Sequence, residues 1–328
     1  MSDWKTSIVR ISNKEKHPNA DTLSIFSLEN LGYQIIDKTE NYNIGDTAIY
    51  VPTDSQMPVT EQYKFLEQHK YRVKAIKLRK IYSQGLLLKN NQNWPIGYDC
   101  SKDLGITKWE MPTPIGFSGK AKPWPNFIEK YDIENILSYP NLFVDKENVI
   151  VTEKVHGTNF TFGWFNEEFF VCSRSFQLEE DNKNVYWKCA RQLDLKNKIL
   201  TLSKQNIAFR GEIYGIQDLK YGKNPNDLGL VIFDIFKENK YISMFDRLVF
   251  CNEYNLLANP ILYQGEFNLE LIKHTITDKR SKLDNNTILE GGVIEPLHAR
   301  FDYNLGRWLK LKFLNPAYLC RKEGTEFH

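Results

Sequence analysis

The stretch NVIVTEKVHGTN, residues 148–159, joins an apolar, β-branched run to a glycine turn. The run NVIVTEK predicts a strand, and Gly157 predicts a tight turn three residues after Lys154. This pattern presents the Lys154 amine at the mouth of a sheet. A free lysine has a pKa of about 10.4, so a nucleophilic lysine needs a depressed pKa at neutral pH. Taken alone, Lys-x-x-Gly is far more often a surface lysine before a turn.

Further motifs follow in the same half of the chain, and two of them offer polar ligands. Arg174 can hold a ribose hydroxyl or a phosphate with its planar fork, although a structural ion pair is as common. Glu212 can accept ribose hydroxyls or hold metal-bound water, and an edge-strand glutamate is the alternative. The motifs are CSRS (172–175), FRGEIYG (209–215), VIFDIF (231–236) with EGGVIE (290–295), and WLKLKF (308–313).

The last motifs supply an aromatic ring, a second carboxylate and two cations. Phe233 lies in a core-like run, and stacking on adenine requires it at the rim of a pocket. Glu290 stands beside paired glycines, which permit close backbone approach. Lys310 and Lys312 alternate with apolar residues, so strand periodicity puts both ammonium groups on one face, where phosphate is the natural anion between them. With a metal ion, this pair is expected to depress the pKa of Lys154.

The first part of the chain predicts short strands separated by turns. Residues 47–54, TAIYVPTD, and 83–89, SQGLLLK, each predict a strand. In YRVKAIKLRKI, residues 71–81, the apolar alternation slips by one residue, which indicates a β-bulge of the kind that bends strands in small barrels. These features predict a five-stranded barrel of the oligonucleotide-binding (OB) kind. HPNADTL, residues 17–23, resembles the opening of tRNA-binding barrel modules of some aminoacyl-tRNA synthetases, which favours the same fold.

Residues 68–98 contain no Asp or Glu and gather basic residues beside Tyr71 and Tyr82. Basic residues interleaved with aromatic ones suit a surface that follows phosphates and stacks bases. A solvated strand face is the alternative, and charge runs are usually that. The basic residues are Lys70, Arg72, Lys74, Lys77, Arg79, Lys80 and Lys89.

The length of 328 residues allows two domains, and four prolines within 111–126 predict a linker between them. We predict an OB-like nucleic-acid-binding or accessory domain over 1–110 and an α+β domain of antiparallel sheets flanked by helices over 127–328. The start MSDWKTSIVR has no apolar signal, and no stretch could span a bilayer, which predicts a cytoplasmic, intracellular protein. Five well-separated cysteines argue against a disulfide framework and a structural zinc site. The net charge of +2 is too small to indicate nucleic-acid binding from the charge of the whole protein.

The ordered motifs resemble the covalent nucleotidyltransferase superfamily of ATP-dependent ligases and mRNA capping enzymes. EKVHGTN is most similar to the nucleophile motif of RNA ligases, with His156 departing from the Lys-x-Asp-Gly form of DNA ligases and capping enzymes. A barrel that precedes the catalytic domain resembles the Deinococcus and Naegleria type of RNA ligase. The resemblance assigns Lys154 as the adenylated nucleophile, Lys310 and Lys312 as α-phosphate ligands, and Glu212 and Glu290 as metal-associated carboxylates. It assigns nucleotide contacts to Glu153, Asn159, Arg174, Glu212, Phe233 and Val293.

The resemblance implies an ATP-dependent RNA ligase that joins 3′-hydroxyl and 5′-phosphate ends through a lysyl–AMP intermediate. It also implies Mg²⁺ or Mn²⁺ as cofactor, RNA ends or a nicked duplex containing RNA as substrate, and a monomer. The alternatives are a DNA ligase, a GTP-dependent capping guanylyltransferase, and a non-catalytic RNA-binding protein built on the barrel.

Overall fold

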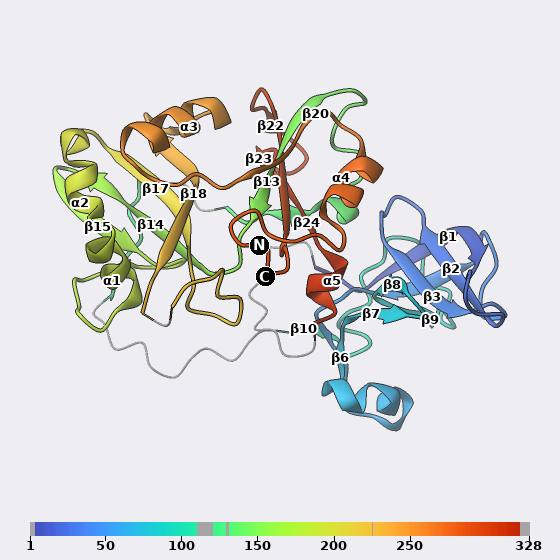
Figure 1. The fold of residues 1–328 in the computed structure, drawn as a ribbon. Coiled ribbons are helices and arrows are strands. Elements are labelled where there is room, and N and C mark those ends of the chain that lie inside the picture. The colour runs from blue at the N-terminus through green and yellow to red at the C-terminus, as the bar shows by residue number, and fades with distance from the viewer. Residues whose placement is uncertain (1–3, 110–120, 129–130, 225, 322–328) are drawn as a thin grey trace. The chain divides into compact units, whose positions relative to one another are not determined.

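The computed structural model describes residues 4–109, 121–128, 131–224 and 226–321, and their contacts form two compact units (Figure 1). The described residues of the first unit come from 1–112, 132–144 and 316–322, and those of the second come from 113–131 and 145–315. Two short segments that follow residue 127 therefore group with the first unit. The linear domain boundaries stay a prediction, and residues 111–120 of the predicted linker lie outside the described residues.

The first unit is built around a closed β-barrel. Its five-stranded sheet runs in the order β3-β2-β1-β4-β9. β8 lies beside β3, because Gln34 Nε2 donates to the Tyr82 carbonyl (2.7 Å) and the Ile36 amide donates to Ser83 Oγ (2.9 Å). Gly85, at φ +113°, turns the chain from β8 into β9, which pairs with β4. The chain thus closes the barrel, and the predicted OB-like fold is confirmed. The strands are β1 (Ser7–Lys16), β2 (Leu23–Leu28), β3 (Gln34–Lys38), β4 (Thr47–Val51), β8 (Ile81–Gln84) and β9 (Leu86–Lys89).

The apolar slip in residues 71–81 is a break between two strands, so the predicted β-bulge is wrong. Lys74 separates β6 (Arg72–Val73) from β7 (Ala75–Leu78). β6 joins a small sheet with β5 (Ser55–Gln56) and β10 (Thr107–Lys108), whereas β7 forms a hairpin with β8. Because β6 and β7 pair with different strands, the buried side of the chain changes between them, and this change produces the slip in the apolar pattern. The unit also contains η1 (Glu61–His69), β12 (Glu134–Asn135), η2 (Ile136–Ser138) and α5 (Pro316–Leu319).

The second unit holds two antiparallel sheets. A seven-stranded sheet runs in the order β11-β16-β15-β14-β17-β18-β19, and in the other sheet β21 lies between β24 and β13, with β20 beyond β13. The first sheet consists of β11 (Ala121–Lys122), β14 (Thr158–Phe165), β15 (Glu168–Cys172), β16 (Gln177–Leu178), β17 (Ile207–Tyr214), β18 (Gly229–Lys237) and β19 (Lys240–Tyr241). The other strands are β13 (Asn148–Lys154), β20 (Ile261–Glu266), β21 (Gly291–Pro296) and β24 (Leu311–Leu314), with a hairpin of β22 (Phe301–Asp302) and β23 (Arg307–Trp308).

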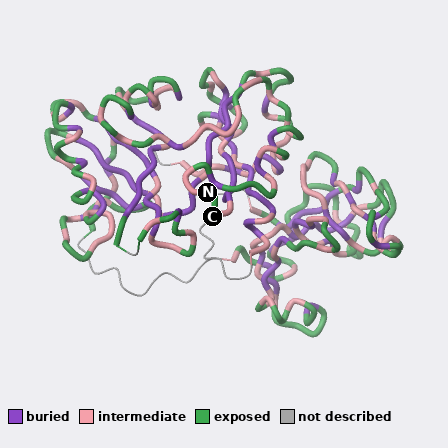
Figure 2. Tube along the Cα trace, viewed as in Figure 1, coloured by how far each residue is buried: buried purple, intermediate pink, exposed green. Residues whose placement is uncertain are grey.

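Short helices cover these sheets, so the predicted α+β class is confirmed, with strands dominating. Cys189 and Leu195 of α1 and α2 pack in one buried cluster with Phe162 and Phe209 of the large sheet. Figure 2 shows buried residues following the central strands. No helix in the described ranges is long and apolar enough to cross a membrane. The helices are α1 (Val185–Gln192), α2 (Leu195–Lys198), η3 (Leu200–Leu202), α3 (Met244–Glu253) and α4 (Leu269–Ile276).

Candidate active site

Lys154 lies where the chain passes from one sheet of the second unit to the other. It is the last residue of β13, and only three residues separate it from the start of β14. Gly157 packs against β17, where an added Cβ would lie 2.9 Å from the Ile213 carbonyl carbon and 3.0 Å from Glu212 Cγ. Only a glycine permits this approach without a shift of the backbone. The glycine therefore brings the Lys154 turn against the strand that carries Glu212.

Side chains that follow β17 hold this turn in place. The buried His156 ring contacts Asp218 through Nε2 at 2.7 Å, and the His156 amide donates to the Tyr221 hydroxyl at 2.7 Å. Gln217 Nε2 donates to the Gly157 carbonyl and to Thr158 Oγ1. The connection after β17 thus fixes the backbone of the turn and the orientation of His156.

Glu290 is the direct partner of Lys154. The Lys154 Nζ lies 2.6 Å from Glu290 Oε1, and the Glu290 side chain is 1% exposed. Its other oxygen, Oε2, is buried without a hydrogen-bond partner among the described residues. The paired glycines that follow allow this position: an added Cβ on Gly291 would strike the Phe313 backbone, and one on Gly292 would lie 2.8 Å from Val151 Cγ1. β21 therefore fits closely between β13 and β24.

Glu212 and Asn159 complete the surroundings of Lys154 from the large sheet. They are directly opposite each other on β17 and β14. Burial raises the pKa of Glu212 to about 8, with Glu290 adding to the rise and Lys154 opposing it. Asn159 Oδ1 is buried and has no hydrogen-bond partner within the described ranges. The buried Glu290 carboxylate, the half-buried Glu212 carboxylate and an unused amide oxygen make this an acceptor-rich site that suits a cation.

The charge around Lys154 differs from the sequence expectation. Burial alone lowers the pKa of Lys154, but the Glu290 and Glu212 carboxylates outweigh burial and raise this pKa above its ordinary value. The expected depression of the pKa by Lys310 and Lys312 is therefore wrong for this structure. The physical reason is that the nearest charges to Lys154 are carboxylates, while Lys310 is engaged elsewhere.

Phe233 is the half-buried residue in an otherwise buried stretch of β18. Across the strand pair, Arg210 faces Asp234 and Gly211 faces Ile232, so Phe233 is the extra residue of a β-bulge. The bulge frees its ring from the alternation of the strand. The sequence prediction requires Phe233 at a pocket rim, and its partial exposure is compatible with that role.

Arg174 is exposed and lies in the turn between β15 and β16. Its positive charge opposes the rise in pKa of both Lys154 and Glu212, which places Arg174 in the electrostatic surroundings of the site. An exposed guanidinium at this place can turn toward a ligand without breaking the core.

The alternation expected around Lys310 and Lys312 is present. Leu309, Leu311 and Phe313 are buried, and the two lysines are half-buried. Lys312 is opposite Val293, a half-buried residue of β21. Val293 therefore lies beside one of the two lysines, and its nucleotide contact stays a prediction.

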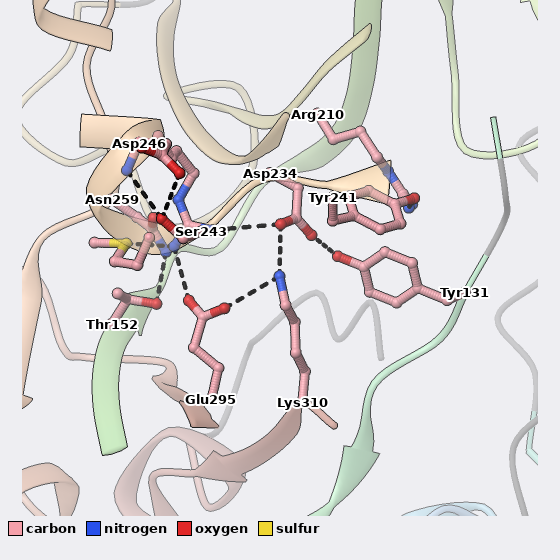
Figure 3. A network of polar contacts seen from close by, with 12 residues as sticks. Tyr131, Thr152, Arg210, Asp234, Tyr241, Ser243, Asp246, Asn259, Glu295 and Lys310 are labelled. Atoms are coloured by element: carbon pink, nitrogen blue, oxygen red, sulfur yellow. Dashed lines mark hydrogen bonds and ion pairs between the residues drawn. The ribbon is translucent and has the colours of Figure 1, made fainter. Parts of the chain in front are cut away.

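Lys310 belongs to a buried network of charges (Figure 3). Its Nζ lies 2.5 Å from Asp234 Oδ1 and 3.2 Å from Glu295 Oε2. Arg247, which is 1% exposed, contacts the same two carboxylates at 3.3 and 2.8 Å. The Tyr131 hydroxyl donates to the other oxygen of Asp234. Burial would raise the pKa of Glu295, but Lys310 and Arg247 lower it to about 2. The sequence interpretation assigns phosphate as the anion for Lys310, whereas here protein carboxylates fill that role.

Glu153 does not present its carboxylate beside Lys154. It is buried and accepts hydrogen bonds from Ser281 Oγ (2.5 Å) and the Lys282 amide (2.8 Å). In a strand, neighbouring side chains point to opposite faces, so Glu153 and Lys154 diverge. The Glu153 carboxylate thus holds the segment before β21, and the nucleotide contact of this residue stays a prediction.

Sequence reasoning missed several residues that organise the site. Asp234 and Glu295 lie inside the quoted motifs VIFDIF and EGGVIE, and a carboxylate within a buried strand is a signal for a cationic partner. Arg247, Gln217 and Asp218 carry no such signal, because they meet the site only through the folding of distant segments.

Comparisons with known proteins agree with this architecture. The sequence matches the RNA ligase family over residues 147–312, and an OB-fold domain over residues 5–90. A solved structure of a Naegleria gruberi RNA ligase variant with ATP and Mn is 24% identical, covers 96% of this chain and 98% of that chain, and has a TM-score of 0.78. The Naegleria gruberi RNA ligase with PPi is 25% identical, covers 96% of this chain and 97% of that chain, and has a TM-score of 0.76. A comparison with curated protein sequences found no match.

The family match covers half of the chain and contains the Lys154 turn, both carboxylates and both lysines of the last motif. The solved structures share the fold across both units. The chain belongs to the RNA ligase family.

Proposed function

We propose that this protein is an ATP-dependent RNA ligase that joins a 3′-hydroxyl end to a 5′-phosphate end through AMP bound covalently to Lys154. The observation that carries the proposal is the convergence of three side chains: Lys154 contacts Glu290 at 2.6 Å, and its turn packs against Glu212. Solved relatives with ATP and Mn, with AMP and Mn, and with PPi support the choice of nucleotide.

In the first step the Lys154 amine, after losing a proton, attacks the α-phosphorus of ATP. A nitrogen–phosphorus bond forms, the bond from the α-phosphorus to the bridging oxygen breaks, and pyrophosphate leaves. AMP then passes to the 5′-phosphate of the RNA, and the 3′-hydroxyl displaces it to form the phosphodiester. Positioning and electrostatics supply most of the rate in phosphoryl transfers of this kind.

The residues around Lys154 have matching roles in this scheme. Phe233 stacks on adenine, while Asn159 and Arg174 hold ribose or phosphate oxygens, and Val293 lines the pocket. Lys310 and Lys312 face the α-phosphate, and Asp234 with Glu295 sets the direction of Lys310. The network around Lys310 is rigid enough to hold its ammonium group in one place, because four charges and a tyrosine meet there.

The carboxylates fit Mg²⁺ or Mn²⁺ held partly by the nucleotide. No cluster of three or more metal-ligating side chains occurs among the described residues. Glu290 has one oxygen without a hydrogen-bond partner, and the raised pKa of Glu212 shows that its negative charge is poorly stabilised. Such ions commonly use one or two carboxylates with substrate phosphates and water. A bound cation would neutralise the carboxylates and the phosphate oxygens. Burial would then be the main influence on Lys154, and burial favours the neutral amine that attacks.

The test is incubation of purified protein with α-labelled ATP and a divalent cation, followed by denaturing electrophoresis. Lys154→Ala is expected to abolish the labelled band, and Lys240→Ala, at an exposed position in the same unit, is the matched control. Mass spectrometry first shows whether the protein is already adenylated. Nicked duplexes with RNA or DNA at the 3′-hydroxyl side then separate RNA ligation from DNA ligation. Labelling of Lys154→Ala at the control level, or labelling by GTP instead of ATP, would overturn the proposal.

A further inference from the structure

Two loops of the barrel are locked together at one end. The loop between β1 and β2 meets the tip of the β7–β8 hairpin. Asn19 Nδ2 donates to the Arg79 carbonyl at 2.9 Å, and Arg79 Nη1 donates to the Asn19 carbonyl at 3.0 Å. The buried His17 ring contacts the Leu78 carbonyl at 3.2 Å. The motif HPNADTL therefore holds the tip of the hairpin in place, which gives this motif a structural role apart from the residues proposed for ligation.

The braced hairpin carries uncompensated positive charge. Lys74, Arg79 and Lys80 form no ion pair with the carboxylates of the described residues, and Arg79 and Lys80 are exposed. Asp21 in the neighbouring loop is paired with Lys16 at 3.1 Å. Residues 68–98 contain no acidic residue, and although Arg72 pairs with Asp54 outside this segment, the charges of Arg79 and Lys80 lie side by side at the exposed tip. An anionic partner is the arrangement that relieves their repulsion.

Arg79 and Lys80, at the tip of the hairpin, have a backbone conformation that is unusual for long cationic residues. Arg79 and Lys80 have φ values of 42° and 78°, in the left-handed region that glycine and asparagine occupy most readily in two-residue hairpin turns. Two long cationic side chains thus occupy positions where smaller residues are favoured. The contacts to Asn19 and His17 hold the tip in this conformation and keep the charges projecting from the barrel.

The hairpin is poorly equipped to stack bases. Tyr82 is its one aromatic residue, and the Lys77 ammonium lies over that ring at 4.4 Å. The outward positions of β2 are Leu23, Ile25 and Ser27, which offer no aromatic platform. Proteins that bind single strands combine basic grooves with aromatic stacking, whereas duplex binding relies on the phosphate backbone. The loop pair therefore suits the backbone of a duplex.

We propose that the β1–β2 loop and the β7–β8 hairpin form a phosphate-binding surface for duplex RNA, independent of base sequence. Loops at these two places in OB barrels are used for oligonucleotide binding, which agrees with the location. The inference rests on the proposed function only in naming RNA as the nucleic acid. It assigns Lys74, Arg79 and Lys80 to substrate binding and not to adenylate formation.

The test measures binding of the full-length protein to a fluorescent nicked RNA duplex with a 5′-hydroxyl, which cannot be sealed. The variant is Arg79→Ala/Lys80→Ala. Lys5→Ala/Lys102→Ala is the matched control, because it removes two exposed basic residues from the same unit. Each duplex phosphate contact contributes a slope of about 0.9 in log affinity against log salt, or roughly fivefold at 0.15 M salt. Two contacts predict about 30-fold weaker binding and a salt slope smaller by about 2.

Charge-conserving and catalytic controls make the result specific. Arg79→Lys/Lys80→Arg is expected to bind as the unaltered protein does, and thermal unfolding checks that every variant is folded. AMP labelling in the absence of RNA is expected to be equal in all variants, so its failure would count against the ligase proposal and not against this surface. Equal binding by Arg79→Ala/Lys80→Ala and the matched control would overturn the inference. So would a loss of affinity that is as large for single-stranded RNA as for the duplex.

Discussion

The substitution Gly157→Ala tests whether close packing of the turn sets the position of Lys154. An alanine Cβ would lie 2.9 Å from the carbonyl carbon of Ile213, whereas carbon atoms pack at about 3.5–4.0 Å. The turn must therefore move away from β17 by roughly 0.6–1 Å. A displacement of about 1 Å at a reacting group costs on the order of 10²-fold in rate. We expect the rate of Lys154 adenylation to fall by about that factor.

Gly163→Ala is the matched control for this prediction. Gly163 lies within β14, the strand that begins directly after Gly157, and its added Cβ would lie 2.9 Å from the carbonyl carbon of Ile207 on β17, the strand that also carries Ile213. Both substitutions overpack one pair of strands and cost about 1–3 kcal/mol in stability. Only Gly157 adjoins Lys154, so Gly163→Ala is expected to label at a rate near that of the unaltered protein.

Single-turnover labelling with α-labelled ATP provides the rates, at a temperature where circular dichroism shows each variant folded. Saturating ATP separates a slower chemical step from weaker nucleotide binding. Equal losses of rate in Gly157→Ala and Gly163→Ala would refute the reasoning, because global loosening would then explain both. An unchanged rate in Gly157→Ala would refute it as well.

Two further predictions concern charge. Burial raises the pKa of Glu212 from its model-compound value of 4.5 to about 8, so the folded protein binds this proton more tightly than the unfolded chain does. The resulting stability is present below the unfolded pKa and lost as pH rises through the folded pKa. Without added metal, the midpoint temperature of thermal unfolding should decrease as the pH rises from 4.5 to 8. The decrease should be smaller in Glu212→Gln, and an equal decrease in the variant and the unaltered protein would contradict this prediction. Arg247→Met should lower the free energy of unfolding in urea by about 3–5 kcal/mol, because Asp234 and Glu295 lose a buried partner. Arg191→Met, which removes the exposed pair with Glu180, should cost at most about 1 kcal/mol, and similar losses in the two variants would count against the network.

The fold was predictable where local pattern and tertiary pairing agree. Strand signals at 47–54 and 83–89 correspond to barrel strands, because each is a short apolar run between turns. The slip within 71–81 was misread because a break between two strands and a bulge produce the same one-residue change in the apolar pattern. A real bulge occurs at Phe233, where an unbroken apolar run gives no sign of it. Pairing partners far away in sequence decide both cases.

The sequence predicts which residues belong to the candidate site better than it predicts the contacts between them. The sequence pattern puts Lys154 at a strand end, Glu212 within a strand motif and Glu290 beside paired glycines, and the structure brings all three together. Periodicity also placed Lys310 and Lys312 on one face. It could not show that Asp234 and Glu295 converge on Lys310, since those contacts join different strands and, for Asp234, residues 76 positions apart. Charge effects on Lys154 were mispredicted for the same reason.

Lys154 and Lys310 are each paired with buried carboxylates, and this pairing has a consequence for the proposed mechanism. Lys154 and Glu290 stabilise each other as an ion pair, because a buried charge without a partner is costly. The same contact keeps the amine protonated and therefore unreactive. Under the proposed mechanism, a nucleotide arriving with a cation would compete for Glu290 and would thereby release the amine to attack the α-phosphorus. Lys310 differs, since Asp234, Glu295 and Arg247 form a closed network that does not include Lys154. The proposed mechanism thus gives the two lysines opposite requirements: Lys154 would have to leave its carboxylate to react, and Lys310 would have to keep its carboxylates to stay oriented.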